Sequence, residues 1–159
     1  MRALVVFYSL EGNTKFIAEK IAETAGADCI ALHPRKTYPR TGIRKYVWGG
    51  KGVLFGETPD LTNDPIDWNS DDTIFIGTPI WAGSYAPPIK TFLQQYPMQG
   101  KQIALFACHG GGGAEACFQK LRSALSQNTV VGQMAFPQPT RTPDQSAEQA
   151  VAWVKSLPI

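Results

Sequence analysis

Strand-length apolar runs alternate with segments of helical period along this chain, and this alternation limits the fold more than any other feature. Five runs are rich in apolar residues: 3–8, 28–32, 73–77, 102–108 and 130–136. The first, third and fourth are almost continuously apolar, which is typical of strands buried on both faces of a parallel sheet. Strands that alternate with helices predict right-handed crossovers and an open, doubly wound α/β fold.

The segments that separate or follow these runs have apolar residues at the spacing of amphipathic helices. They span residues 13–25, 87–96, 115–125 and 142–157. In the last segment we expect Thr142 to be the N-cap, Pro143 to occupy the first helical position and Gln145 to complete a capping box.

Length and composition favour one globular domain over residues 1–159. The chain is 43% hydrophobic and 18% charged, with a net charge of +2, which argues against disorder and against nucleic-acid binding. The apolar run at 3–8 is too short for a signal peptide or a membrane span, so we expect a cytoplasmic protein with no membrane partner. Three cysteines without Cys-x-x-Cys spacing, and two histidines, predict neither a disulfide framework nor a metal site.

Residues 33–68 interrupt the alternation with a long segment rich in glycine and proline. This excursion also holds a basic cluster: Arg35, Lys36, Arg40, Arg44, Lys45 and Lys51. We expect a short helix near 43–48 and otherwise an extended path. Such a loop is either functional or a solvated segment packed on the sheet edge.

Ligands of open parallel sheets bind at the carboxyl ends of the strands, so the loops after the first, third and fourth runs are the candidates for a site. In the first, "SLEGNT", hydroxyls and a glycine stand directly before a helix, an arrangement that can cradle a phosphate. The alternative is an ordinary turn capped by Asn13 or Thr14. Neither the Walker nor the Rossmann glycine pattern is present.

The other two loops offer surfaces for a flat ligand. In "TPIWAGSYAPP", Trp81 follows the strand and can cover a planar group, although buried tryptophans are more often core residues. In "HGGGGAE", successive glycines let the backbone approach a ligand edge, although they also suit a flexible turn. Together the three loops suit a phosphorylated planar cofactor.

The run "VVFYSLEGNTKFIAEKI" resembles the phosphate loop of the flavodoxin family. The positions that fit this pattern are Val5, Val6, Phe7, Ser9, Gly12, Thr14, Ala18 and Ile21. The loops "TPIWAGSYAPPIKTFL" and "ACHGGGGAEACF" are similar to that family's isoalloxazine-binding loops. The resemblance covers nearly the whole chain, and the 33–68 excursion is the part least like a flavodoxin.

The resemblance implies a flavodoxin-like, five-stranded parallel sheet of order 2-1-3-4-5, helices on both faces, and FMN as cofactor. It implies that the FMN phosphate is held by residues of the first loop: Ser9, Glu11, Gly12, Asn13 and Thr14. It places along the flavin ring five residues of the second loop: Pro79, Ile80, Trp81, Ala82 and Gly83. It places at the pyrimidine edge three residues of the third loop: His109, Gly110 and Gly111. Thr78 is expected at the ribityl chain.

The function implied by the resemblance is electron transfer through FMN, for which no catalytic side chain is required. The alternative is an NAD(P)H-dependent reductase of quinones or flavins, and a third interpretation is an interaction module that has lost the cofactor. The slight positive charge departs from the acidic character of typical flavodoxins, so the redox partner, a protein or an NAD(P)H-linked reductase, stays open. The choice between monomer and homodimer stays open as well. For Cys108, near the predicted ring, a buried apolar role is favoured over redox activity.

Overall fold

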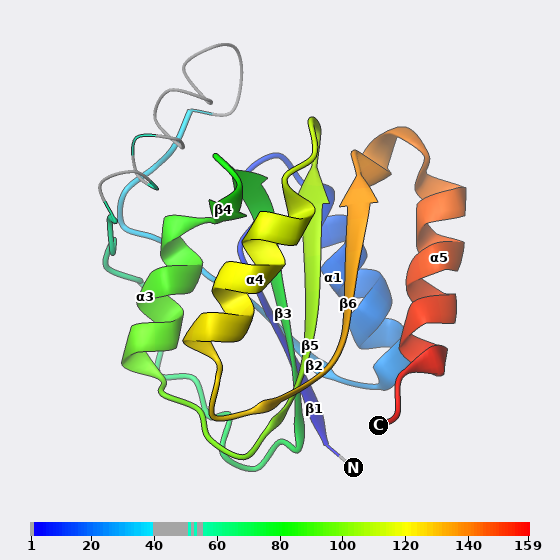
Figure 1. Cartoon of the computed structure of the whole chain (residues 1–159), viewed down its shortest axis with the longest axis horizontal. Coiled ribbons are helices and arrows are strands. Elements are labelled where there is room, and N and C mark those ends of the chain that lie inside the picture. The colour runs from blue at the N-terminus through cyan, green and yellow to red at the C-terminus, as the bar shows by residue number, and fades with distance from the viewer. Residues whose placement is uncertain (1, 40–50, 52, 54–55) are drawn as a thin grey trace.

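A parallel sheet lies between two layers of helices in the computed structural model of the chain, which describes residues 2–39, 51, 53 and 56–159 (Figure 1). Its parallel strands are β1 (Ala3–Phe7), β2 (Asp28–Ala31), β3 (Thr73–Trp81), β5 (Gln102–His109) and β6 (Thr129–Pro137). They lie in the order β2-β1-β3-β5-β6, and the short β4 (Ser84–Tyr85) pairs antiparallel with the end of β3. With β4 set aside, this is the predicted order 2-1-3-4-5, so the predicted fold is confirmed.

Two helices cover each face of the sheet (Figure 1). The helices are α1 (Asn13–Ala25), α3 (Pro87–Gln95), α4 (Ala114–Ala124) and α5 (Pro143–Ser156), and a short 3-10 helix, η1 (Pro139–Arg141), precedes α5. Helices α1 and α5 share one apolar cluster, and α3 and α4 share the other. The four amphipathic helices predicted at 13–25, 87–96, 115–125 and 142–157 are therefore present, with bounds within one residue of those expected. Among the described residues, no helix is both long and apolar enough to cross a membrane.

Strand β1 shows why a nearly continuous apolar run was the right indication of a buried strand. Leu4 and Val6 pack into the cluster on the α3/α4 side, whereas Val5 and Phe7 pack into the cluster on the α1/α5 side. All four side chains are at most 4% exposed. Because successive strand residues point to opposite faces, a strand covered on both faces has no polar positions to alternate with.

Strand β3 is longer than the sequence predicted. The prediction ended it at Gly77, but pairing with β5 continues through Pro79, after which Ile80 and Trp81 pair with β4. Glycine and proline indicate the end of a strand in sequence. Here both stay in the sheet, so the segment taken for a loop from Thr78 onward begins as strand.

Two expectations about helix capping were wrong or only partly right. The N-cap of α1 is Gly12, in a left-handed conformation, rather than Asn13 or Thr14. Thr142 is the N-cap of α5, as predicted, but no side chain caps that helix and the capping box with Gln145 does not form. The Thr142 hydroxyl instead lies 3.1 Å from the hydroxyl of Ser146.

The two described arms of the 33–68 excursion lie against each other. Pro34 and Leu61 form an antiparallel bridge, and the N–H of Thr62 donates to the carbonyl oxygen of His33 over 2.7 Å. Tyr38 and Ile66 are buried in the cluster on the α3/α4 side. The excursion is thus anchored in the core at both arms. The helix expected near 43–48 lies outside the described residues.

The close approach of β3 to β5 gives a test of the core. A Cβ added at Gly77 would overlap the buried ring of Phe106. We expect Gly77→Ala to lower the free energy of unfolding by about 1–3 kcal/mol, the usual cost of overpacking. Urea denaturation measures this effect. Gly111→Ala is the matched control, because a Cβ there meets nothing within 4 Å; equal midpoints for the two variants would contradict the prediction.

Candidate functional site

A cavity of about 310 Å³ opens at the carboxyl ends of β1, β3, β5 and β6. It lies beside the point between β1 and β3 where the strand order reverses, which is where open α/β sheets bind ligands. Its lining consists of Ser9, Leu10, Glu11, Asn13, Thr14, Pro79, Ile80, Trp81, Ala82, Cys108, His109, Gly110, Gln138, Thr140 and Arg141. Residues from the three predicted loops are therefore brought together in one cavity.

The first loop forms one wall of this cavity and leads directly into α1. Gly12 has a φ of 103°, a conformation that favours glycine, and its N–H donates to Ser9 Oγ over 3.2 Å. No side chain caps the helix. The N–H groups of a first helical turn have no acceptors within the helix, and they carry the positive end of its dipole. This end of the cavity is therefore suited to an anion.

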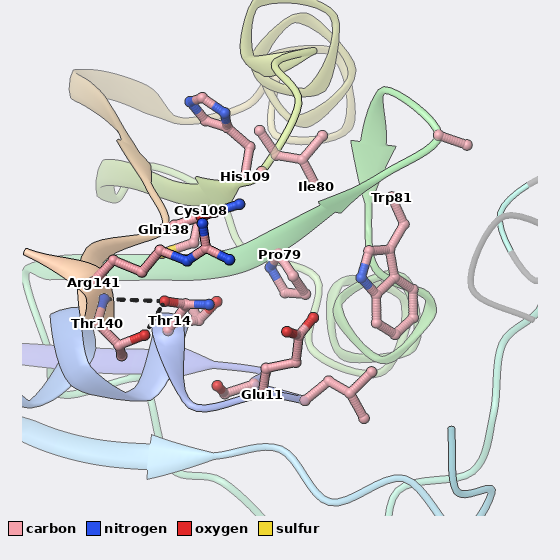
Figure 2. A pocket seen from close by; sticks show the side chains of 15 residues that line it. Glu11, Thr14, Pro79, Ile80, Trp81, Cys108, His109, Gln138, Thr140 and Arg141 are labelled. Carbon is pink, nitrogen blue, oxygen red and sulfur yellow. Dashed lines mark hydrogen bonds between the residues drawn. The ribbon is translucent and has the colours of Figure 1, made fainter. Parts of the chain in front are cut away.

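Asn13 joins the first loop to η1, the short helix that follows β6. Its side-chain oxygen accepts hydrogen bonds from the Thr140 N–H, over 3.1 Å, and from the Thr140 hydroxyl, over 2.8 Å (Figure 2). The amide oxygen is thus engaged within the protein. Asn13 can therefore offer a ligand its main-chain N–H and the two donors of its side-chain amide nitrogen.

The second wall stands on a β-hairpin, which fixes Trp81 more firmly than an irregular loop would. Trp81 pairs with Ser84, and the residues between them, Ala82 and Gly83, both have positive φ, as type I′ hairpin turns require. Pro79 and Ile80 continue this wall along β3. Gly83 lies outside the cavity lining, and a Cβ placed on Gly113 would stand 3.3 Å from its Cα.

An aromatic cluster holds Trp81 from the side. Its ring meets Tyr8 at 5.7 Å and Tyr38 at 5.1 Å between centroids, both in edge-to-face geometry. Burial, and to a lesser extent the Glu57 carboxylate, raise the pKa of Tyr38 to about 12, so the Tyr38 phenol is uncharged at neutral pH. Edge contacts of this kind contribute about 0.5–1.5 kcal/mol each. The excursion therefore reaches the site through Tyr38.

The third loop brings its backbone to the cavity. His109 and Gly110 line it, whereas Gly111 does not. The N–H of Gly112 donates to His109 Nδ1 over 3.1 Å, which orients the imidazole. Gly112 and Gly113 have φ of 93° and 87°, so glycine is needed there for the turn into α4.

Thr78 occupies a place different from its expected one beside the ligand. It is fully buried and does not line the cavity. Its hydroxyl accepts from the Ala86 N–H over 2.9 Å and donates to the Pro79 carbonyl oxygen over 2.8 Å. Since both bonds lie within the protein, the contact with a ribityl chain stays a prediction that this geometry does not favour.

Cys108 lines the cavity, in agreement with its expected place near the ring. Four other lining residues were missed by the sequence analysis: Leu10, Gln138, Thr140 and Arg141. Three of them follow β6. The loop after this strand was not considered, although β6 ends at the same edge of the sheet as β1, β3 and β5. The rule that places ligands at the carboxyl ends of parallel strands applies to that strand too and would have found them.

The charged groups of the lining are few. Arg141 carries the guanidinium and Glu11 the carboxylate, and both side chains are exposed. Burial raises the pKa of the Cys108 thiol to about 12, although a hydrogen bond with the Thr14 side chain lowers it in part. Within the described residues, no group of histidine, cysteine and acidic side chains is placed to hold a metal ion.

Comparisons with known proteins agree with this geometry. A family model described as Flavodoxin matches residues 2–155. A flavoprotein from Lactobacillus acidophilus NCFM, solved in complex with FMN, is 26% identical with a TM-score of 0.74 over 91% of this chain and 98% of its own.

Two further structures show likeness of fold alone. A protein described as a flavoprotein from Bacteroides eggerthii is 19% identical with a TM-score of 0.78, covering 99% of this chain and 98% of its own. An NADPH-quinone reductase from P. pentosaceus is 11% identical with a TM-score of 0.61, covering 97% and 95%.

The three thiols give a second test. We expect iodoacetamide at pH 8 to label Cys29 while Cys108 and Cys117 stay unmodified, because Cys29 is exposed and the other two are buried. The thiolate is the nucleophile, and the pKa is raised to about 11 for Cys29 and to about 12 for the buried pair, so the labelling of Cys29 is itself slow. Peptide mass spectrometry measures the labelling, and unfolding in guanidinium should expose all three. Labelling of Cys108 as fast as Cys29 would contradict its inert role.

Proposed function

The chain belongs to the flavodoxin family, and from this premise we propose that it carries electrons through a bound FMN. It is a flavodoxin-like FMN protein. The observation that carries the proposal is that one cavity combines an anion-binding end with an apolar, aromatic wall. Its volume of about 310 Å³ falls within the range of small-molecule sites, ~300–1,000 Å³.

The residues at the anion-binding end fit the FMN phosphate. Ser9 and Thr14 contribute hydroxyls, and the uncapped first turn of α1 offers its N–H groups. Backbone N–H groups at a helix N-terminus are a common way of binding phosphate. Ser9, Glu11, Gly12, Asn13 and Thr14 are therefore proposed as the phosphate site, with Glu11, Gly12 and Asn13 acting through the backbone.

The residues of the opposite wall fit the isoalloxazine ring. Pro79, Ile80 and Trp81 present apolar surface from β3 and the hairpin, which excludes water from one side of a flat ligand. His109 and Gly110 bring the main chain to the other side of the cavity, where N–H and C=O groups can pair with the pyrimidine edge. Ala82 completes the lining on this side, whereas Gly83 and Gly111 lie outside it.

FMN, when bound, supplies one- and two-electron redox chemistry. The task of the protein is to hold the ring, keep water from it and set its potential. The apolar wall and the nearby phosphate both disfavour added negative charge on the ring, so they lower its potential. No side chain of the lining is needed as acid, base or nucleophile.

The proposed partner is a redox protein or an NAD(P)H-linked reductase, and the proposed location is the cytoplasm. The basic residues of the excursion favour an acidic partner surface. In the described part of that segment, however, Lys36 is paired with Glu57 over 2.8 Å, so part of this charge is neutralised. The rival function, direct reduction of a quinone or flavin by NAD(P)H, needs the nicotinamide to reach the ring.

The visible spectrum and the response to nicotinamide cofactors test the proposal. We expect the purified protein, or the apoprotein mixed with FMN, to show the bands of bound flavin. We further expect stopped-flow mixing with NADPH or NADH to leave these bands intact over minutes. Rapid bleaching would favour the reductase over the electron carrier. The lack of any flavin band, with FMN in excess, would instead indicate an interaction module without cofactor.

Trp81 tests the ring end of the site. We expect Trp81→Ala to weaken FMN binding by about 1–3 kcal/mol, the range for stacking of a flat heteroaromatic ring on an aromatic side chain. The midpoint potential should rise because water gains access to the ring. Titration of the apoprotein and spectroelectrochemistry measure the two effects. Trp81→Phe, which keeps an aromatic face, is the control; unchanged affinity and potential in Trp81→Ala would remove Trp81 from the ring contact.

A further inference from the structure

We propose that the Arg141 guanidinium binds the FMN phosphate and sets the preference of the site for FMN over riboflavin. This inference rests on the proposed FMN site. It adds a residue from the far end of the chain to a phosphate loop that has no lysine or arginine among residues 9–14.

Arg141 lies at the phosphate end of the cavity. It is the last residue of η1, which follows β6, and it lines the same cavity as Ser9 and Thr14. Figure 2 shows its side chain reaching over Thr14, with the guanidinium directed into the cavity rather than out along η1. The guanidinium thus faces the space above the first turn of α1.

The backbone that carries Arg141 is fixed to the phosphate loop. The neighbouring residue, Thr140, donates two hydrogen bonds to the side chain of Asn13, the first residue of α1. The Arg141 N–H donates to the Gln138 carbonyl oxygen over 2.9 Å, which closes the turn of η1. The distance between the α1 terminus and Arg141 is therefore set by short contacts, although the two residues that join them are 127 positions apart in sequence.

The charge balance of the cavity calls for a cation at this place. A phosphate monoester carries about −1.5 to −2 charges at pH 7, and a helix end supplies only about +0.5. Among the residues that the structure describes, Arg141 is the one lysine or arginine of the lining. Its planar fork also matches two phosphate oxygens at once.

Lys15, which follows the loop in sequence, is already in an ion pair, whereas, among the described residues, Arg141 is not. Lys15, in the first turn of α1, lies outside the lining and pairs with Glu19 over 3.9 Å. Within the described part of the chain, Arg141 forms neither a salt bridge nor a side-chain hydrogen bond. Its guanidinium can therefore move onto a phosphate without breaking an existing pair.

The test compares FMN with riboflavin, which differ only in the phosphate. Apoprotein of the wild type and of Arg141→Gln is titrated with each flavin, with quenching of flavin fluorescence as the signal. We expect Arg141→Gln to reduce the ratio of FMN to riboflavin affinity about tenfold, the scale of one charged hydrogen bond. Added salt should reduce the wild-type ratio more than that of the variant.

Arg122→Gln is the matched control. It removes the same charge from α4, where Arg122 is exposed and donates to Gln133 Oε1 over 2.9 Å, outside the cavity lining. Its ratio should stay at the wild-type value. A fall of less than about threefold in Arg141→Gln, or an equal fall in Arg122→Gln, would overturn the role of Arg141. Wild-type protein that binds neither flavin would instead overturn the proposed function itself.

Discussion

The main-chain hydrogen bonds at the end of β1 are the constraint on which the site depends. The Phe7 carbonyl oxygen accepts from the Leu32 N–H over 2.7 Å, and the Tyr8 N–H donates to the Gly77 carbonyl oxygen over 3.1 Å. The strand is therefore held from both sides up to the residue before the phosphate loop. Strands β2 and β3 lie on opposite sides of β1, so the strand order reverses beside β1. In open α/β sheets the loops at such a point separate, and a cavity opens at the carboxyl ends of the strands.

Much of this arrangement could be predicted from the sequence because it follows from local physical chemistry. Continuous apolar runs such as Ala3–Phe7 have few ways to be buried except in a parallel sheet, and α1 has the bounds that its apolar stripe indicated. The order of the strands was predicted from the resemblance to the flavodoxin family. That resemblance was supported by the match of Ser9, Gly12 and Thr14 to the family's phosphate-loop pattern. The loops after β1, β3 and β5 then meet at one edge by topology alone.

The features that the sequence did not predict depend on tertiary contacts. Gly77 and Pro79 stay in β3 because β5 supplies their pairing, and the Phe106 ring uses the space that a side chain at Gly77 would fill. The hydrogen bonds from Thr140 to Asn13 bring η1, and Arg141 with it, to the start of α1. No local pattern encodes contacts between residues so far apart in sequence.

The position of the charges also has a physical reason. A lysine or arginine within the first loop would lie against the positive end of α1 and destabilise the protein by about 0.3–1 kcal/mol whenever the phosphate is absent. Glu11 has the opposite effect there, since a carboxylate near a helix N-terminus is stabilising. A cation carried by η1 instead stays exposed to solvent, where its repulsion from the helix end is screened. Carrying Arg141 on η1 therefore lets the site offset the phosphate without weakening the helix that holds it.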